Sequence, residues 1–399
     1  MFRSIRNAAK YPDRKLILWV AIAIAFSKWY ADLREKIHVG HTKKALHPLL
    51  QEWLVTSRLL AEGYRPPALF SLGTQYMAGS IHTILHFLIR QAITNSPVKF
   101  KREFLTLDDG GTVGLDWAVS SRGTEAPTGS DVPIVFLQHG IGGNSDAQYI
   151  QNISDRLIHS AVAYRPVCMV ARGCGKVPLT CNKGFSAAGF EDVAQAVAHI
   201  HKNNPSAKIY AVGYSMGAII MANYIGRSGS ECLFSGAVVF SASWDFSQKT
   251  PYFPIWSSKF LAPSMKQYLS ENHETFNEHP LMDFNKAMGA ECIHDFDAHA
   301  TVLTHGYDDV DHYYHVASPI NNGVEQISIP TLSICARDDP VCSIEGANTI
   351  EKNDLYGPGL VILKTNRGGH LGWGEGVLGN TSWMDRVVED FFEHLERNN

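Results

Sequence analysis

Short apolar runs recur through the middle of the chain and alternate with segments of helical periodicity. The runs span residues 132–137, 161–171, 208–212, 233–240, 330–335 and 360–363. The first of them, Val132-Pro133-Ile134-Val135-Phe136-Leu137, is apolar throughout, as expected for a strand buried on both faces. Helical spacing appears at 190–201, 218–225 and 384–395. The alternation predicts an α/β fold with a mostly parallel central sheet and helices on both faces.

The remaining segments divide the chain into an expected core, a lead-in and a cap. Residues 101–117 predict a strand pair around the turn Asp109-Gly110-Gly111. Residues 45–99 predict a helical lead-in, and the α/β core is expected to span 100–243 and 326–399. Between these two parts, residues 244–325 are rich in aromatic residues, histidine and proline and lack the alternating rhythm. We expect this interval to form an inserted, mainly helical cap.

The amino-terminal segment 1–44 is basic and contains a hydrophobic stretch at 16–31. This stretch is shorter than the roughly 20 apolar residues of a spanning helix and longer than most signal-peptide centres. No small-residue cleavage site follows it, and Lys28, Trp29 and Tyr30 resemble interfacial anchors. We expect a membrane anchor, and hence a single-pass membrane protein of the endoplasmic reticulum or another internal membrane, facing an undetermined side. The alternative is an amphipathic or buried helix that packs on the domain.

The composition of the chain excludes several classes of partner and cofactor. The chain has 399 residues, 45% of them hydrophobic, which is ample for a folded core. Its net charge of −4 provides no general basic surface, so we expect no nucleic-acid partner. The seven cysteines form no C-x-x-C pair and are expected to be mostly free thiols, with no metal site. No nucleotide motif is present and no cofactor is expected. The oligomeric state stays open.

One short motif carries the candidate chemistry. Gly213-Tyr214-Ser215-Met216-Gly217 follows an apolar strand and precedes a helix. That context is typical of a nucleophile elbow, in which a strained turn exposes a reactive serine. Without it the pentapeptide would be weak evidence, because a glycine-rich turn before a packed helix has the same composition. We therefore predict that Ser215 is a nucleophile.

A serine hydroxyl needs a base and an orienting carboxylate, which follow the serine in the order acid, then histidine in this topology. His370 lies in a glycine-rich loop after the last strand, whereas His394 lies inside the terminal helix. His370 is the predicted base. The preceding loop contains Asp338 and Asp339, and either could serve. We favour Asp339, because the following proline keeps it out of the helical region and fixes the direction of the turn.

The developing oxyanion requires two N–H donors. One is predicted to be the backbone of Met216, directly after the nucleophile. The other should come from the loop after the first buried strand, His139-Gly140-Ile141-Gly142-Gly143, and Ile141 is the predicted donor. A plain glycine-rich turn between strand and helix would have the same sequence.

Taken together, these residues resemble the membrane-associated branch of the α/β-hydrolase-domain family, which includes single-pass animal lipases and yeast ethanol acyltransferases. The resemblance spans most of the chain. Besides the predicted triad it covers Leu115-Asp116-Trp117, residues 171–175 with Leu179-Thr180, Phe296-Asp297, Gly306-Tyr307 with Tyr313-Tyr314, and residues 368–373. It implies an α/β-hydrolase fold, favours Asp339 and implies the amino-terminal anchor. The family usually has Gly-His-x-x-Thr before the domain, whereas this chain reads Gly79-Ser80-Ile81-His82-Thr83, so we assign His82 no role.

These observations favour a serine ester hydrolase acting on a lipid ester such as a monoacylglycerol, a phospholipid or a shorter carboxylic ester. An acyltransferase that passes the acyl group to an alcohol or thiol would use the same triad. A noncatalytic binding protein is a third hypothesis, which the intact triad disfavours. The substrate-binding residues stay unknown. Six aromatic residues fit either an acyl channel or the core of the cap: Trp244, Phe246, Tyr252, Phe253, Trp256 and Phe260.

Overall fold

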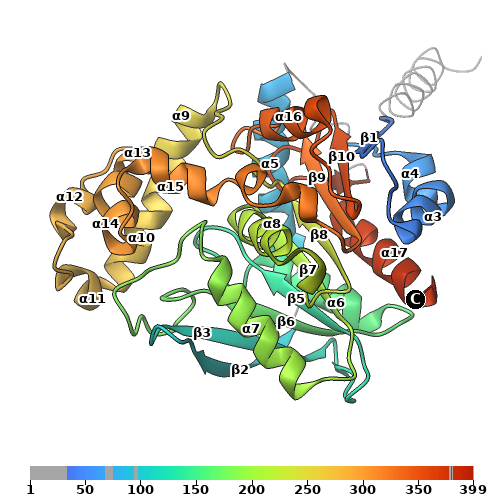
Figure 1. The fold of residues 1–399 in the computed structure, drawn as a ribbon, viewed down its shortest axis with the longest axis horizontal. Helices are drawn as coiled ribbons and strands as arrows, with labels where there is room; N and C mark the ends of the chain where they lie inside the picture. The colour runs from blue at the N-terminus through green and yellow to red at the C-terminus, as the bar shows by residue number, and fades with distance from the viewer. Residues whose placement is uncertain (1–33, 68–74, 94–97, 377–378, 380, 399) are drawn as a thin grey trace, which may run out of the picture.

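The fold is built around one large, mostly parallel sheet, seen in a computed structural model that describes residues 34–67, 75–93, 98–376, 379 and 381–398 (Figure 1). Its strand order is β1-β10-β9-β8-β7-β5-β6-β3-β2, and β4 pairs with β3. The six strands from β10 to β6 in this order are parallel, and β1, β2, β3 and β4 are antiparallel to their neighbours. The strands are β1 (His38–His41), β2 (Lys99–Thr106), β3 (Thr112–Ser121), β4 (Thr124–Glu125), β5 (Ile134–Gln138), β6 (Arg165–Val170), β7 (Ile209–Tyr214), β8 (Gly236–Phe240), β9 (Thr331–Ala336) and β10 (Leu360–Thr365). The predicted fold class is confirmed.

The central strands are buried along their whole length. Every residue of β5, β7, β8, β9 and β10 is buried, which explains why these strands appear in the sequence as continuous apolar runs. Helices α7 (Phe190–Asn203) and α8 (Met216–Ser228) pack together on one face of the sheet. Helices α6 (Gln148–His159) and α17 (Trp383–Asn398) pack together on the other face. Helix α16 (Glu345–Asn353) connects β9 to β10, and a two-stranded ribbon of β11 (Gly374–Glu375) and β12 (Thr381–Ser382) precedes α17.

Residues before the core also join the fold. Strand β1 adds an antiparallel edge beside β10, with Val39 opposite Leu363. Helices α3 (Pro48–Thr56) and α4 (Arg58–Glu62) lie near α17, where Trp53 Nε1 and Ser57 Oγ both donate to Asp390, each at 2.9 Å. Helix α5 (Gln75–Ile93) runs beside the loops that follow β9 and β10. Residues 34–67 and 75–93 therefore pack against the sheet, against α17 and against the loops that follow β9 and β10.

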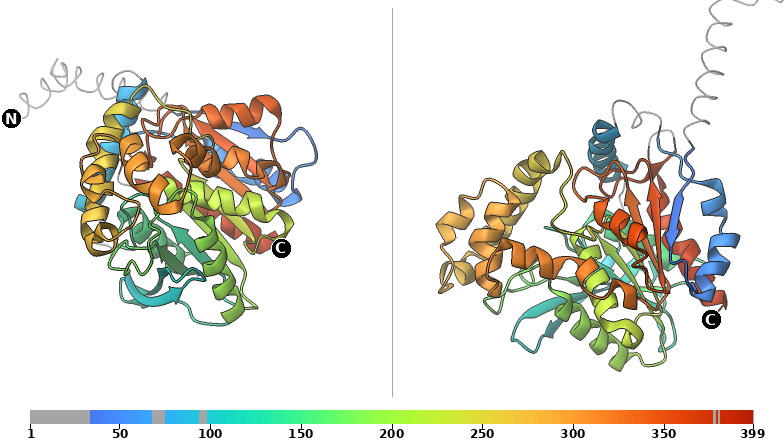
Figure 2. Two further views of the ribbon diagram at one scale, coloured as in Figure 1. Left: turned by 60° about the vertical axis from the view of Figure 1, so that its left-hand side comes forward. Right: turned by 45° about the horizontal axis from the view of Figure 1, so that its top comes forward.

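A helical lobe is inserted between β8 and β9 (Figure 2). Its elements are α9 (Phe253–Trp256), η3 (Ser257–Leu261), α10 (Ala262–Glu271), α11 (His273–Asn277), α12 (Phe284–Met288), α13 (Ile293–Phe296), η4 (Asp297–Thr301), α14 (Val302–His305) and α15 (Val310–Ala317). The short 3-10 helices η5 (Pro319–Asn321) and η6 (Val324–Gln326) lead back to the sheet, and η2 (Gly229–Glu231) follows α8. We call this lobe the cap. Its α9 approaches α5, where Trp256 Nε1 donates to Ser80 Oγ at 3.3 Å.

The expected single-pass membrane localisation is corrected. A spanning helix needs about 20 predominantly apolar residues. None of the helices in the described ranges is both long enough and apolar enough to cross a bilayer. Even α5, with 19 residues, is interrupted by Ser80, His82 and His86. The hydrophobic stretch 16–31, from which the anchor was inferred, lies outside the described residues.

Candidate active site

Ser215 occupies a strained turn between β7 and α8. Its backbone has φ 54° and ψ −120°, a conformation that side chains rarely adopt. The glycines two positions away make the turn sterically feasible. A Cβ on Gly213 would lie 2.7 Å from the Ala218 Cα, and one on Gly217 would lie 2.5 Å from the His139 carbonyl oxygen. The local sequence thus forms a nucleophile elbow, with the glycines in the positions that the crowding requires.

His370 lies between Ser215 and Asp339. Its Nε2 is 2.8 Å from Ser215 Oγ, and its Nδ1 is 3.0 and 3.1 Å from the two carboxylate oxygens of Asp339. Ser215 follows β7, Asp339 follows β9 and His370 follows β10. Because these strands are parallel, their carboxyl ends meet at one edge of the sheet. The structure therefore brings together the three residues predicted from chain order, at hydrogen-bonding distances.

The two neighbouring aspartates have different partners. Asp339 Oδ1 accepts hydrogen bonds from the backbone N–H groups of Val341 at 2.8 Å and Cys342 at 2.9 Å, which fix the carboxylate facing His370. Asp338 Oδ1 instead accepts from the backbone N–H of Gly369, at 2.8 Å. Burial, aided by the charge of Asp339, raises the pKa of Asp338 to about 8. Asp338 is therefore mostly protonated at neutral pH, and its contact with Gly369 supports the histidine loop. Asp339 is the aspartate that is oriented toward His370.

Helix α5 holds the histidine loop from outside the core, a contact that sequence reasoning missed. The backbone N–H of His370 donates to Thr83 Oγ1 at 2.8 Å, and this hydroxyl donates to the Gly79 carbonyl at 2.8 Å. A Cβ on Gly79 would overlap the carbonyl oxygen of Asp338, so the helix can approach only with glycine there. The Gly-x-x-x-Thr spacing was the available signal. His82 packs against Gly369 and is neutral, because burial lowers its pKa to about 4.

The loop after β5 has a fixed peptide orientation next to Ser215. The Gly140 carbonyl accepts from the Gly143 N–H at 3.1 Å and lies 2.7 Å from His139 Nδ1. His139 Nε2 accepts from the Ala171 N–H at 3.1 Å, so we assign the ring proton to Nδ1. Burial lowers the pKa of His139 to about 4, which keeps the ring neutral.

This arrangement determines the direction of the Ile141 N–H. The Gly140 carbonyl and the Ile141 N–H belong to one planar trans peptide unit and point in opposite directions. Holding the carbonyl against His139 therefore holds the N–H on the other side of the loop. Ile141 and Met216, the two predicted oxyanion donors, line the same pocket as Ser215.

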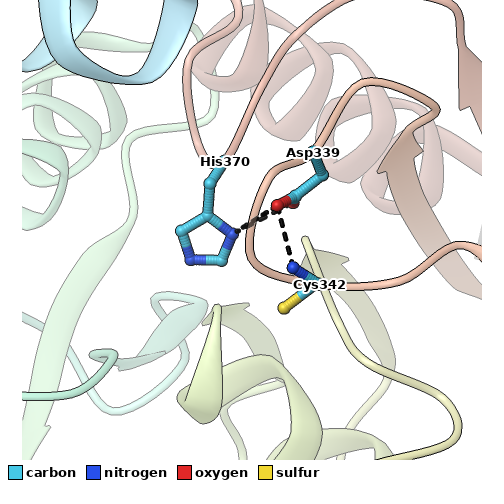
Figure 3. A group of neighbouring side chains, drawn as sticks. All are labelled: Asp339, Cys342 and His370. Atoms are coloured by element: carbon cyan, nitrogen blue, oxygen red, sulfur yellow. Dashed lines mark hydrogen bonds and ion pairs between the residues drawn. The ribbon is translucent and has the colours of Figure 1, made fainter. Parts of the chain in front are cut away.

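Asp339, Cys342 and His370 also resemble a metal-binding group, because one ligand atom from each lies within 4.8 Å of the others (Figure 3). The hydrogen bonds argue for another role. His370 Nδ1 is bonded to Asp339, and Cys342 interacts with the same carboxylate through its backbone N–H. Burial also raises the pKa of the Cys342 thiol well above its usual value. These hydrogen bonds suit a triad of Ser215, His370 and Asp339 better than a metal centre.

Two networks of ion pairs support the loops around the site. Both carboxylate oxygens of Asp116 accept from Arg102, at 2.6 and 2.7 Å, and Arg102 also donates to the Gly175 carbonyl at 2.6 Å. Arg172 bridges Asp109 and Asp192 in a second network. These charge-assisted bonds attach β2 and β3 to the loop after β6.

Comparisons with known proteins agree with this architecture. Residues 129–356 match the Hydrolase_4 family model, described as "Serine aminopeptidase, S33". Phospholipase ABHD3 of Mus musculus is 30% identical over 317 residues, covering 77% of this chain and 75% of that protein. Medium-chain fatty acid ethyl ester synthase/esterase 2 of Saccharomyces cerevisiae is 28% identical over 292 residues, covering 67% and 63%. Monoacylglycerol lipase of the same yeast is 25% identical over 320 residues, covering 69% and 70%.

The family match spans more than half of the chain. It includes strands β5 to β9, the elbow at Ser215 and the acid loop that contains Asp339. The chain therefore belongs to the α/β-hydrolase family that the Hydrolase_4 model represents.

Proposed function

We propose that this protein is a serine hydrolase that cleaves carboxylic esters of lipids through an acyl-enzyme on Ser215. The observation that carries the proposal is the chain of contacts from Ser215 Oγ to His370 Nε2, at 2.8 Å, and from His370 Nδ1 to Asp339, at 3.0 Å. The enzyme class, a carboxylic ester hydrolase, accords with the family and with relatives named phospholipase, esterase and monoacylglycerol lipase.

The first half of the reaction forms the acyl-enzyme. His370 Nε2 accepts the Ser215 proton as Oγ attacks the ester carbonyl carbon, and Asp339 stabilises the imidazolium that results. The carbonyl oxygen becomes an oxyanion, for which the Met216 and Ile141 N–H groups are the proposed donors. As the tetrahedral intermediate collapses, His370 gives its proton to the alcohol oxygen, and the carbon–oxygen bond of the ester breaks. The alcohol leaves and the acyl group stays on Ser215.

The second half releases the acid. Water occupies the position of the departed alcohol, and His370 Nε2 takes its proton as its oxygen attacks the acyl carbon. Collapse of the second intermediate returns the proton to Ser215 Oγ and frees the carboxylic acid. Both halves use the same base and the same oxyanion donors, so no further catalytic group is required.

A lipid ester is the proposed substrate because the cavities beside the triad are apolar. The cavity that reaches His370 has a volume of about 450 Å³ and includes Phe87, Leu88, Trp256 and Phe260 in its walls. Its size lies in the range of small-molecule binding sites. The printed names of the relatives, which include phospholipase and monoacylglycerol lipase, support the same substrate class.

Acyl transfer to an alcohol is the second candidate function. One relative is named as both an ethyl ester synthase and an esterase, which favours an acyl-enzyme that accepts ethanol as well as water. The same His370 would deprotonate either acceptor. The two functions differ only in the acceptor of the second half-reaction.

A panel of lipid esters tests the proposal. Purified wild type and Ser215→Ala would be incubated with a monoacylglycerol, a phospholipid and short-chain esters, in water with and without ethanol. We expect wild type, and not the variant, to release fatty acid, and to form ethyl ester if alcohols are accepted. Equal release by both proteins from every ester would refute the proposed hydrolysis of lipid esters.

A further inference from the structure

Exposed apolar side chains gather on three short elements beside the active site. Ten large apolar side chains of the described residues are exposed, and six of them belong to α5, α9 or η3. We call these six the apolar patch: Met77, Ile84, Phe87, Leu88, Ile255 and Phe260. A folded protein rarely leaves so many apolar side chains together in water unless the surface they form binds something.

Helix α5 has two sides with different contacts. On one side, Thr83 Oγ1 accepts from the His370 backbone N–H at 2.8 Å, so this side is attached to the histidine loop. On another side, Met77, Ile84 and Leu88 follow one another after seven and four residues, which aligns them along the helix. All three are exposed. The helix is therefore fixed to the catalytic loop on one side and presents apolar side chains on another.

The cap contributes the rest of the apolar patch. Trp256 Nε1 of α9 donates to Ser80 Oγ of α5 at 3.3 Å, which brings the cap next to α5 (Figure 2). The Trp256 ring also stacks on that of Phe260 in η3, with centroids 4.6 Å apart. Phe87 of α5 and Phe260 line one cavity of about 450 Å³, which also has His370 in its wall. Because both phenylalanines are exposed, the patch lies at an entrance to the active site.

The charges around the apolar patch favour one kind of partner. Residues 63–102 and 246–270, which include α5, α9 and η3, contain no aspartate or glutamate, although the chain has 39 and a net charge of −4. The charged residues of 246–270 are the cations Lys249, Lys259 and Lys266. A phospholipid bilayer has phosphate groups above an apolar interior, so it attracts lysines and accepts apolar side chains. The acidic remainder of the chain is repelled by the same surface, which orients the patch toward it.

A lipid surface also suits the position of the cavity. A protein bound over the patch would cover the entrance that leads to His370, whereas a bilayer would present its own esters there. Helices that attach to a bilayer from one side lie in the plane of the interface, with their apolar side chains below the headgroups. The aligned apolar side chains of α5 fit this arrangement, which needs no helix that crosses the bilayer.

We propose that the apolar patch of α5, α9 and η3 docks on the surface of a phospholipid bilayer. Its six apolar side chains lie below the headgroups, and the exposed Lys259 lies at the level of the phosphates. Docking places the entrance of the His370 cavity against the lipid, so that an ester passes from the bilayer to the triad without crossing water. The inference goes beyond the proposed function, because attachment to a bilayer requires no reaction and is measured without one.

Vesicle co-sedimentation tests the docking. The Ser215→Ala protein, which leaves the lipids intact, is mixed with vesicles of phosphatidylcholine and phosphatidylserine. Met77→Glu and Ile255→Glu are then combined in this parent protein. Both positions are more than half exposed, at 52% and 58%, and neither side chain lines the His370 cavity. The paired variant loses two apolar contacts and adds two negative charges, so we expect its affinity for the vesicles to fall about tenfold or more.

Val55→Glu combined with Leu281→Glu is the matched control. Both positions are exposed and apolar, but Val55 belongs to α3 and Leu281 lies between α11 and α12, elements that lie away from α5 and α9 (Figure 1). The control should bind the vesicles as the parent does. Absence of binding by the parent, full binding by the paired variant or an equal loss in the control overturns the proposal. A dimer that the paired variant abolishes, with vesicle binding unchanged, would assign the patch to a second copy and overturn it too.

Activity measurements separate docking from catalysis. With Ser215 restored, the paired variant should hydrolyse a water-soluble ester at the wild-type rate, because neither altered residue lines the cavity. It should hydrolyse esters held in vesicles about tenfold more slowly than wild type. An equal loss on the soluble ester and the vesicle ester overturns the docking role. If wild type hydrolysed neither ester while the parent bound vesicles and the paired variant did not, the proposed function would fail and the docking would stand.

Discussion

At the scale of single residues, two adjacent aspartates show how local contacts separate similar side chains. Asp339 is 3% exposed and faces His370, while two backbone N–H groups hold its carboxylate. Asp338, fully buried, supports the Gly369 backbone from the other side. The sequence favoured Asp339, through the proline that follows it and the family resemblance, but it did not show what either side chain contacts. Their roles depend on which way each side chain points from the turn.

Substituting each aspartate by asparagine distinguishes their roles. Asp339→Asn removes the charge that stabilises the His370 imidazolium and favours the wrong tautomer, so kcat should fall by about 10⁴-fold. Asp338→Asn retains an oxygen for the Gly369 N–H, and its kcat should fall less than about tenfold. Steady-state hydrolysis of one ester by the three proteins checks this. A larger loss for Asp338→Asn than for Asp339→Asn would reverse the assignment.

Asp338 should also make stability depend on pH. Its ordinary pKa of 3.8 is raised to about 8 in the folded protein by burial. Between these values the native state binds more protons than the unfolded state, so the free energy of unfolding falls as pH rises. The contribution is fully present below about pH 4 and is lost as pH rises through about 8.

Urea denaturation of wild type and Asp338→Asn from about pH 5 to pH 8.5 measures this effect. Other titrating groups are common to both proteins and cancel in the difference between them. We expect the stability of wild type relative to the variant to decline steadily across this range. Parallel profiles would mean that Asp338 ionises normally in the folded state.

At the scale of elements, the site is formed by loops at the carboxyl ends of the strands, and hydrogen bonds to other parts of the chain fix these loops in place. The loop after β5 is held by His139, whose ring connects the Gly140 carbonyl to the Ala171 N–H. The histidine loop is held by Thr83 of α5. Such supports explain how irregular segments keep side chains and N–H groups within hydrogen-bonding reach of a reacting atom.

Replacing His139 tests the support of the oxyanion donor. His139→Phe keeps a planar aromatic ring at this position but removes the bond to the Gly140 carbonyl, which frees the Gly140–Ile141 peptide to rotate. Loss of one oxyanion donor costs about 10²- to 10³-fold in kcat, so we expect a fall of about 10²-fold with little change in KM. His394→Phe, at a position in α17 remote from the triad in sequence and bonded to the Leu49 carbonyl, is the matched control. An unchanged kcat in a folded His139→Phe would contradict the proposed donor arrangement.

At the scale of the whole molecule, the parallel sheet made much of the fold predictable. Apolar runs located its central strands, and their parallel order implied that Ser215, Asp339 and His370 would meet at one edge, as their distances show. Strand β1 was not predicted, because its four residues His38–His41 have no distinctive pattern. The support from Thr83 was also missed, since it joins residues 287 positions apart. The prediction of a single-pass membrane localisation was wrong: it was drawn from the hydrophobic stretch 16–31 and the family resemblance, whereas no helix in the described ranges could cross a bilayer.

The most direct test of the account concerns the reactivity of Ser215. A fluorophosphonate probe reacts with a serine only where a base activates the hydroxyl and an oxyanion site receives the phosphoryl oxygen. Wild type and Ser215→Ala would be treated with the probe, and the labelled peptide identified by mass spectrometry. We predict stoichiometric labelling of wild type at Ser215 and none of the variant. Absence of label from the folded wild type, or equal labelling of Ser215→Ala, would contradict the assignment of Ser215 as the nucleophile.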